Sequence, residues 1–388
     1  MRPSLFGMIA YAALASLASP SSLAQVAPEW SLCGGTGSAD VRIQSCTALI
    51  ASEQESAANH AIAYSNRGAA WFTNRDFDRA FADFDQAIKL DPHYAMAYTN
   101  RGAAWNVTGD YDHAIADLDQ AIQFDPKLAL AYVNRANALN AKHDLNRAIA
   151  DLDEAIRLDP KYALAYANRS AFRYVSGDID GANADLDEAI KLDPSLPGVY
   201  RNRAVAWALK GERDRAIADF DQAIRLDPSD AQGYVGRGNA LNGKHDVKAA
   251  MADYDQAIRL ESKYAPAYLS RGVARYNNGD VDGAVADLNE AISLNPDLAI
   301  AYEVRGIAWY RKKDLDHAIA DYNQAIRLNP KYARAYLGRG DAWKDKGDFD
   351  RAVADYDAAI RLDPKLTAAH AGRCNALKLK GPVDADCR

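Results

Sequence analysis

The stretch from 129 to 162, ALAYVNRANALNAKHDLNRAIADLDEAIRLDPKY, decides the fold because its pattern recurs along the chain. The proline near its end recurs every 34 residues from Pro92 to Pro364, and only Ser262 interrupts the series. Placing this proline at position 32 of the period gives nine full repeats, from Ala61 to Leu366. A fixed period of this length is typical of a solenoid, in which each unit stacks on the next.

Each repeat contains two helix-like patterns. Position 4 is always tyrosine, position 8 is small, positions 20 and 27 are alanine, and position 28 is isoleucine. Apolar or small residues at 4, 8 and 11, and again at 20, 24, 27, 28 and 30, follow helical spacing. The small residues allow the two helix backbones to approach closely. The sequence therefore predicts an all-α chain with two antiparallel helices per repeat.

Two junctions separate these helices. Gly109 is expected to end a first helix and Asp110 to cap the second. At the other junction, Asp125 is expected to cap the following helix, with Pro126 at its first helical position.

The small residue at 8, alanine at 20 and proline at 32 resemble the tetratricopeptide repeat (TPR) family. The resemblance covers about four-fifths of the chain. It implies a right-handed α-solenoid of helix-turn-helix repeats, with a concave groove lined by positions 2, 5, 6, 9, 12 and 13 of the first helices. Residues 25–60 and 367–388 are then expected to form cysteine-containing caps at the two ends.

Position 7 departs from the family, which has an apolar residue there. It is arginine in all nine repeats, and position 23 is aspartate in all nine. Because a charge between packed helices is costly unless it is paired, we expect each arginine to form a bridge between first and second helices, with a position-23 aspartate of its own or a neighbouring repeat. The alternative is a ladder of arginines for anionic ligands, whose field the aspartates would cancel. The arginines are Arg67, Arg101, Arg135, Arg169, Arg203, Arg237, Arg271, Arg305 and Arg339.

Asparagine occupies position 6 in five consecutive repeats, and its amide can donate to and accept from a peptide backbone. The pattern is similar to the asparagine ladder of O-linked N-acetylglucosamine transferases, although asparagine at this position is also common in TPR sequences. These asparagines are Asn66, Asn100, Asn134, Asn168 and Asn202.

A second set of candidate binding residues recurs three repeats apart. They offer amides and aromatic faces to a peptide or, alternatively, to a sugar. The simpler explanation of the recurrence is a duplicated three-repeat block without functional meaning. The set is Asn137, Asn140, Tyr174, Asn239, Asn242 and Tyr276.

The first 24 residues have the pattern of a signal peptide. Arg2 precedes an apolar run from Leu5 to Ala18, and Ser22-Leu23-Ala24 offers small residues for cleavage before Gln25. A membrane anchor is the alternative. The run from Leu5 to Ala18 is about 14 residues long, whereas spanning a bilayer takes roughly 20 apolar residues. We therefore expect a periplasmic or secreted protein that is not stably inserted in the membrane.

Four cysteines form two equally spaced pairs, Cys33 with Cys46 and Cys374 with Cys387. In an exported protein these pairs favour two disulfides that close the solenoid ends. The alternative is a zinc site formed by all four cysteines, which requires the two ends of the array to meet.

Known catalytic patterns are missing from the sequence. The seven histidines contain no metal-spaced pair, and no serine elbow, phosphate loop or Cys–His constellation occurs. We therefore expect no enzyme activity, cofactor or metal. The net charge of -7, without a basic stripe, argues against nucleic acid. The sequence favours a protein-interaction scaffold of a bacterial cell envelope that binds an extended peptide or a partner helix. The alternative is a carbohydrate-binding or polysaccharide-export adaptor, and the oligomeric state is undetermined.

Overall fold

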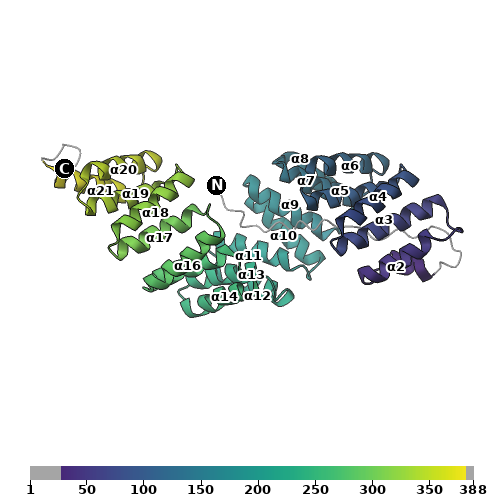
Figure 1. The fold of residues 1–388 in the computed structure, drawn as a ribbon, viewed down its shortest axis with the longest axis horizontal. Helices are drawn as coiled ribbons and strands as arrows, with labels where there is room; N and C mark the ends of the chain where they lie inside the picture. The colour runs from purple at the N-terminus through teal and green to yellow at the C-terminus, as the bar shows by residue number, and fades with distance from the viewer. Residues whose placement is uncertain (1–27, 382–388) are drawn as a thin grey trace. The chain divides into compact units, whose positions relative to one another are not determined.

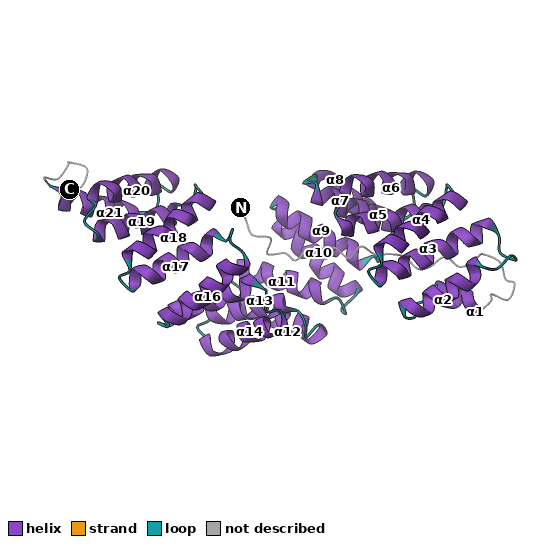
Figure 2. Ribbon diagram, in the orientation of Figure 1, coloured by secondary structure: helices purple, strands orange, loops and turns teal. Residues whose placement is uncertain are grey.

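The computed structural model describes residues 28–381, and every regular element in that range is an α-helix (Figures 1 and 2). Residues 1–27 and 382–388 lie outside the description, and with them the predicted signal peptide, the cleavage before Gln25, and Cys387. None of the described helices is long and apolar enough to cross a membrane.

The chain divides into two compact units, one ending at Ala206 and the other starting at Trp207, inside helix α11 (Pro197–Leu209). The first unit contains α1 (Pro28–Cys33), α2 (Ala39–Ile50), α3 (Ala57–Thr73), α4 (Phe77–Leu90), α5 (Ala95–Thr108), α6 (Tyr111–Phe124), α7 (Ala129–Ala141), α8 (Leu145–Leu158), α9 (Ala163–Ser176) and α10 (Ile179–Leu192). The second contains α12 (Arg213–Leu226), α13 (Ala231–Gly243), α14 (Val247–Leu260), α15 (Ala265–Asn277), α16 (Val281–Leu294), α17 (Ala299–Arg311), α18 (Leu315–Leu328), α19 (Ala333–Asp345), α20 (Phe349–Leu362) and α21 (Thr367–Lys380).

The helices follow the predicted repeats, with a first and a second helix in each. The second helices from α4 to α20 begin at position 17 of their repeats, and most first helices begin at position 1. Helix α3 begins earlier, at Ala57, because the Ser56 hydroxyl accepts a hydrogen bond from the Asn59 backbone N–H at 3.1 Å and caps it.

The turn at Gly109 and Asp110 matches the prediction. Gly109 ends α5 in the left-handed conformation, with φ of 87°, and Asp110 caps α6 by accepting from the His113 N–H at 3.2 Å. His143 adopts the same left-handed conformation at the equivalent turn, with φ of 64°.

The turn between repeats differs from the prediction. Asp125 ends α6, and its carboxylate accepts from the Lys127 N–H at 3.0 Å. Residues 125–128 thus form a local turn. Helix α7 begins after it, at Ala129, and has no side-chain cap. The expectation that Asp125 caps the next helix, with Pro126 at its first position, is therefore wrong.

Close helix packing explains the small residues of each repeat. The alanines at positions 20 and 27 are almost completely buried. Where position 8 is glycine, it faces the side chain at position 24. A Cβ added at Gly68 would lie 2.6 Å from Cε1 of Phe84, so the ring needs the space that glycine leaves. The predicted close approach of the two helices is confirmed.

The two faces of each unit are packed differently. Successive first helices contact one another directly: α3 with α5, α5 with α7 and α7 with α9 in the first unit, and α13, α15, α17, α19 and α21 in the second. Within the described residues, successive second helices show no comparable contact. The first helices therefore lie on the more crowded, inner side of each unit.

Candidate binding face

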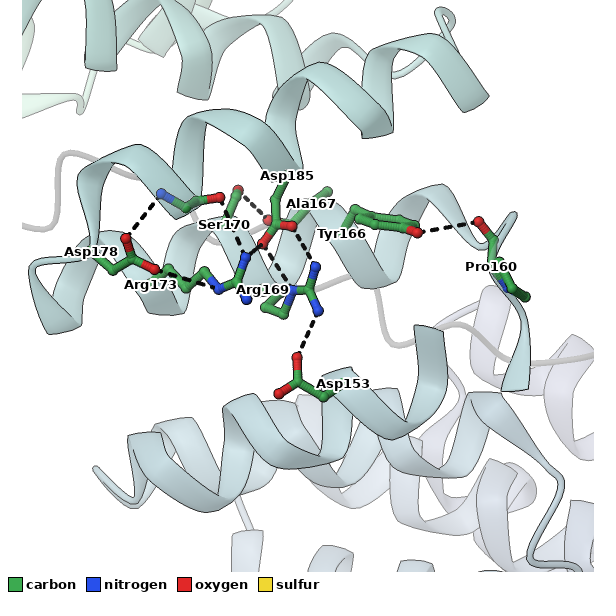
Figure 3. A network of polar contacts seen from close by, with 10 residues as sticks. Asp153, Pro160, Tyr166, Ala167, Arg169, Ser170, Arg173, Asp178 and Asp185 are labelled. Carbon is green, nitrogen blue, oxygen red and sulfur yellow. Dashed lines mark hydrogen bonds and ion pairs between the residues drawn. The ribbon is translucent and has the colours of Figure 1, made fainter. Parts of the chain in front are cut away.

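Arg169 illustrates the role of the arginine at position 7 (Figure 3). Its Nε and Nη2 donate to the two carboxylate oxygens of Asp185, at 2.9 and 2.6 Å, and its Nη1 donates to Asp153 of the preceding repeat at 2.6 Å. The guanidinium also lies over the Tyr166 ring, 5.4 Å from its centroid. One arginine thus joins both helices of its own repeat to the preceding repeat.

The predicted Arg–Asp bridge is confirmed in eight repeats. In each, the arginine donates to both oxygens of the position-23 aspartate, so these guanidinium groups are already occupied by carboxylates. The pairs are Arg67–Asp83, Arg101–Asp117, Arg135–Asp151, Arg169–Asp185, Arg237–Asp253, Arg271–Asp287, Arg305–Asp321 and Arg339–Asp355. Arg203 and Asp219 belong to different units, and their pairing stays a prediction.

The asparagines at position 6 are not accessible. All five side chains are at most 4% exposed, because neighbouring first helices pack against them. The Asn100 amide donates to the Ser65 hydroxyl on the preceding first helix at 3.1 Å, and the Asn168 amide donates to Asn137 Oδ1 at 3.3 Å. The expectation of accessible amides is therefore wrong. In this packing, Asn66, Asn100, Asn134, Asn168 and Asn202 lie between helices instead of facing solvent.

Residue size accounts for the glycine that replaces asparagine at position 6 in some later repeats. Position 6 packs beside position 24 of the preceding repeat, which is leucine at Leu152 before Asn168 but tyrosine at Tyr322 before Gly338. A Cβ added at Gly338 would lie 2.5 Å from Cζ of Tyr322. At Gly338 the ring therefore takes the space of the amide. Phe84 before Asn100 and Leu288 before Val304 are exceptions that this exchange does not explain.

The remaining candidate residues lie nearer to solvent. Asn239 is exposed and its Oδ1 accepts from the Tyr254 hydroxyl at 2.9 Å, while Asn137 is half-buried. Asn140, Tyr174, Asn242 and Tyr276 are half-buried near the ends of their first helices, and together with other position-12 residues they form what we call the position-12 row. This row consists of Phe72, Asn106, Asn140 and Tyr174 in the first unit, and Ala208, Asn242, Tyr276, Tyr310 and Lys344 in the second.

The two units offer different chemistry beside this row. In the first unit Val107 and Val175, both at position 13, are 51% and 60% exposed, and the row itself carries no charge. In the second unit position 13 holds Arg311 and Asp345, and the Tyr310 hydroxyl donates to Asp345 at 2.7 Å. The sequence signal for Arg311 and Asp345 was that position 13 is charged only in the last two repeats and uncharged in all earlier ones.

Glu303 is a buried carboxylate on the same side of the second unit. Its side chain is 3% exposed, it accepts from the Tyr332 hydroxyl at 3.0 Å, and it lies 3.3 Å from Nε of Arg334. Burial raises the pKa of Glu303 above its usual value, against the opposing effects of Arg334 and Tyr332.

The N-terminal cap contains the predicted disulfide between Cys33 and Cys46, with an S–S distance of 2.08 Å. Both cysteines are fully buried in a cluster with Trp30, Leu49 and Ala63. Cys374 is also disulfide-bonded, and Cys387, its predicted partner, lies outside the described residues. Among residues 28–381, no group of three or more acidic, histidine or cysteine side chains is arranged to hold a metal.

Comparisons with known proteins agree with this architecture. The tetratricopeptide repeat models match residues 61–94, 133–197, 173–231, 210–267, 269–331 and 314–366, which is more than half of the chain. The crystal structure of the APC/C hetero-tetramer Cut9–Hcn1 has a TM-score of 0.59 at 14% identity, with coverage of 87% of this chain and 83% of that chain.

A tetratricopeptide repeat protein from Parabacteroides merdae ATCC 43184 has a TM-score of 0.51 at 20% identity, with coverage of 65% of this chain and 98% of that chain. At these identities the two structures support the fold alone. No curated protein matches the chain. The repeat matches and the helical pairs together show that this chain belongs to the tetratricopeptide repeat family, as an all-helical solenoid whose fold is suited to binding other proteins.

Proposed function

We propose that this protein is a non-enzymatic interaction scaffold of the bacterial cell envelope, and that it binds an extended peptide or a partner helix along its first helices. The observation that carries this proposal is the exposure of Val107 and Val175 beside the position-12 row in the first unit. Apolar side chains exposed on one face favour contact with a partner. The half-buried Phe72 and Tyr174 add aromatic area to the same row.

The envelope location rests on the signal-peptide pattern and on the disulfide of the N-terminal cap. Disulfides persist in oxidising compartments such as the periplasm. Cell fractionation combined with intact-mass analysis tests this part. We expect the protein in the envelope fraction or the medium, with Gln25 as its first residue and no free thiol. A cytoplasmic protein that retains Met1 and reacts with a thiol reagent would contradict it.

Site-specific photocrosslinking tests the binding face. A benzophenone amino acid at Val107 or Val175 should capture the same partner protein, identified by mass spectrometry. The matched control is Ala150 on α8, which is exposed on a second helix and should capture nothing. Capture only from Ala150 would move binding to the opposite face. Capture of polysaccharide instead of protein would favour the carbohydrate adaptor.

A further inference from the structure

Arg311 occupies an unusual place at the end of α17. It is exposed, its guanidinium carbon lies 5.4 Å from the centroid of the Tyr276 ring, and Nη1 donates to the Tyr276 carbonyl oxygen at 3.4 Å. Tyr276 belongs to α15, so the arginine bridges two adjacent first helices. The aromatic ring and the carbonyl hold the guanidinium in place without neutralising its charge.

The other charged side chains on this side of α17 and α19 have opposite charges or hydroxyls beside them. Glu303 lies 3.3 Å from Arg334, and Asp341 lies 3.2 Å from Lys344. Asp345 accepts from the Tyr310 hydroxyl at 2.7 Å. By contrast, no carboxylate of residues 28–381 lies within 4.0 Å of Arg311, and within this range most of its five N–H donors have no acceptor.

We propose that Arg311 and Tyr276 form an anchor for one aspartate or glutamate side chain of an extended peptide. This proposal rests on the proposed function and names the chemistry of its partner. A guanidinium recognises a carboxylate through two parallel hydrogen bonds, and the Arg311 guanidinium, which contacts the Tyr276 ring and carbonyl, keeps donors that have no acceptor among the described residues. The half-buried rings of Tyr276 and Tyr310 offer apolar area to the residues that flank the acid.

The surroundings favour a single carboxylate over a polyanion. Asp341 and Asp345 lie on the next first helix, and the chain carries a net charge of -7. A nucleic acid or an anionic polysaccharide would meet these negative charges at neighbouring phosphates or sugars. A peptide with one acidic residue among neutral ones avoids this repulsion.

Selection from a random peptide library on the full-length protein tests the anchor. We compare the wild type with Arg311→Gln and with the control Arg327→Gln, which removes the same charge from an exposed arginine on α18 that donates to Gln324. The wild type and Arg327→Gln should enrich one acidic position, and Arg311→Gln should not. Replacing that acid by its amide in a selected peptide should weaken wild-type binding about tenfold to a hundredfold, and should leave binding to Arg311→Gln unchanged.

The outcomes separate this inference from the proposed function. Selected peptides without an acidic preference, or with one that survives Arg311→Gln, overturn the anchor and leave peptide binding intact. If no variant selects any peptide, both proposals fail. Tighter binding of a heparin or DNA oligomer that depends on Arg311 would overturn the single-carboxylate partner. Thermal unfolding by circular dichroism checks that both variants remain folded.

Discussion

Arg135 and Asp151 meet through two parallel hydrogen bonds, from Nε to Oδ2 at 2.8 Å and from Nη2 to Oδ1 at 2.7 Å. The arginine comes from the first helix of its repeat and the aspartate from the second. The side chains are 18% and 10% exposed, so the pair lies mostly out of water. A bidentate pair in this setting fixes the two helices relative to each other in both position and rotation.

Arg135→Ala should destabilise its repeat by about 3 kcal/mol, because it leaves Asp151 as a buried carboxylate without its partner. Arg169→Ala should cost less, since Arg173 Nη1 also reaches Asp185, at 3.0 Å. Native-state hydrogen exchange of the amides in each repeat measures the two effects locally. The control Asp119→Asn removes only an exposed partner of Arg135 and should have little effect. Equal losses in the two arginine variants would show that Arg173 does not substitute.

Asn100→Ala should lower the melting temperature, because it removes a buried amide and leaves the Ser65 hydroxyl without that donor. The expected loss is about 1–3 kcal/mol. Asn146→Ala, at an exposed position on α8, should leave the melting temperature nearly unchanged. Calorimetry of both variants makes the comparison. An unchanged melting temperature for Asn100→Ala would restore the asparagines as candidates for ligand contact.

Gly338→Asn should destabilise the second unit by about 1–3 kcal/mol, because the new side chain overlaps the Tyr322 ring. Adding Tyr322→Leu should recover part of this loss, since it recreates the combination found at Leu152 and Asn168. Chemical denaturation of both single variants and the double variant gives the coupling energy. Additive effects would refute the size exchange between positions 24 and 6.

Glu303 should make the second unit less stable as the pH rises. Its folded-state pKa lies above the usual value of 4.5 because of burial, so the folded state holds the proton more tightly than the unfolded state. Its contribution is fully present below about pH 4.5 and is lost as the pH rises through the folded-state pKa. Glu303→Gln should remove this loss. Denaturation of the wild type and the variant across this range isolates the effect from that of other carboxylates.

Much of the architecture could be predicted because each position of the repeat occurs nine times in the sequence, so its preferred residue type is clear. The pairing of Arg135 with Asp151 followed from the cost of burying either charge alone. The burial of Asn100 did not follow, because it depends on how closely adjacent first helices approach. The turn at Asp125 was also missed, since an Asp-Pro pair suits both a helix start and a local turn. Tyr276 was a candidate from the sequence, but its contact with Arg311 spans two helices and required the structure.

From the second repeat onward, the third nitrogen of the position-7 arginine links a repeat to the one before it, whereas Arg67 Nη1 donates to Thr47 on α2. In most links it meets an exposed aspartate, as Arg169 meets Asp153, but Arg305 and Arg339 meet the neutral amides of Asn289 and Asn323. Dissolved ions screen an exposed charge pair far more than an amide contact. The links between successive repeats thus differ in their sensitivity to ionic strength. Low salt should strengthen the arginine–aspartate links most, and high salt should make all the links between repeats more nearly equal in strength.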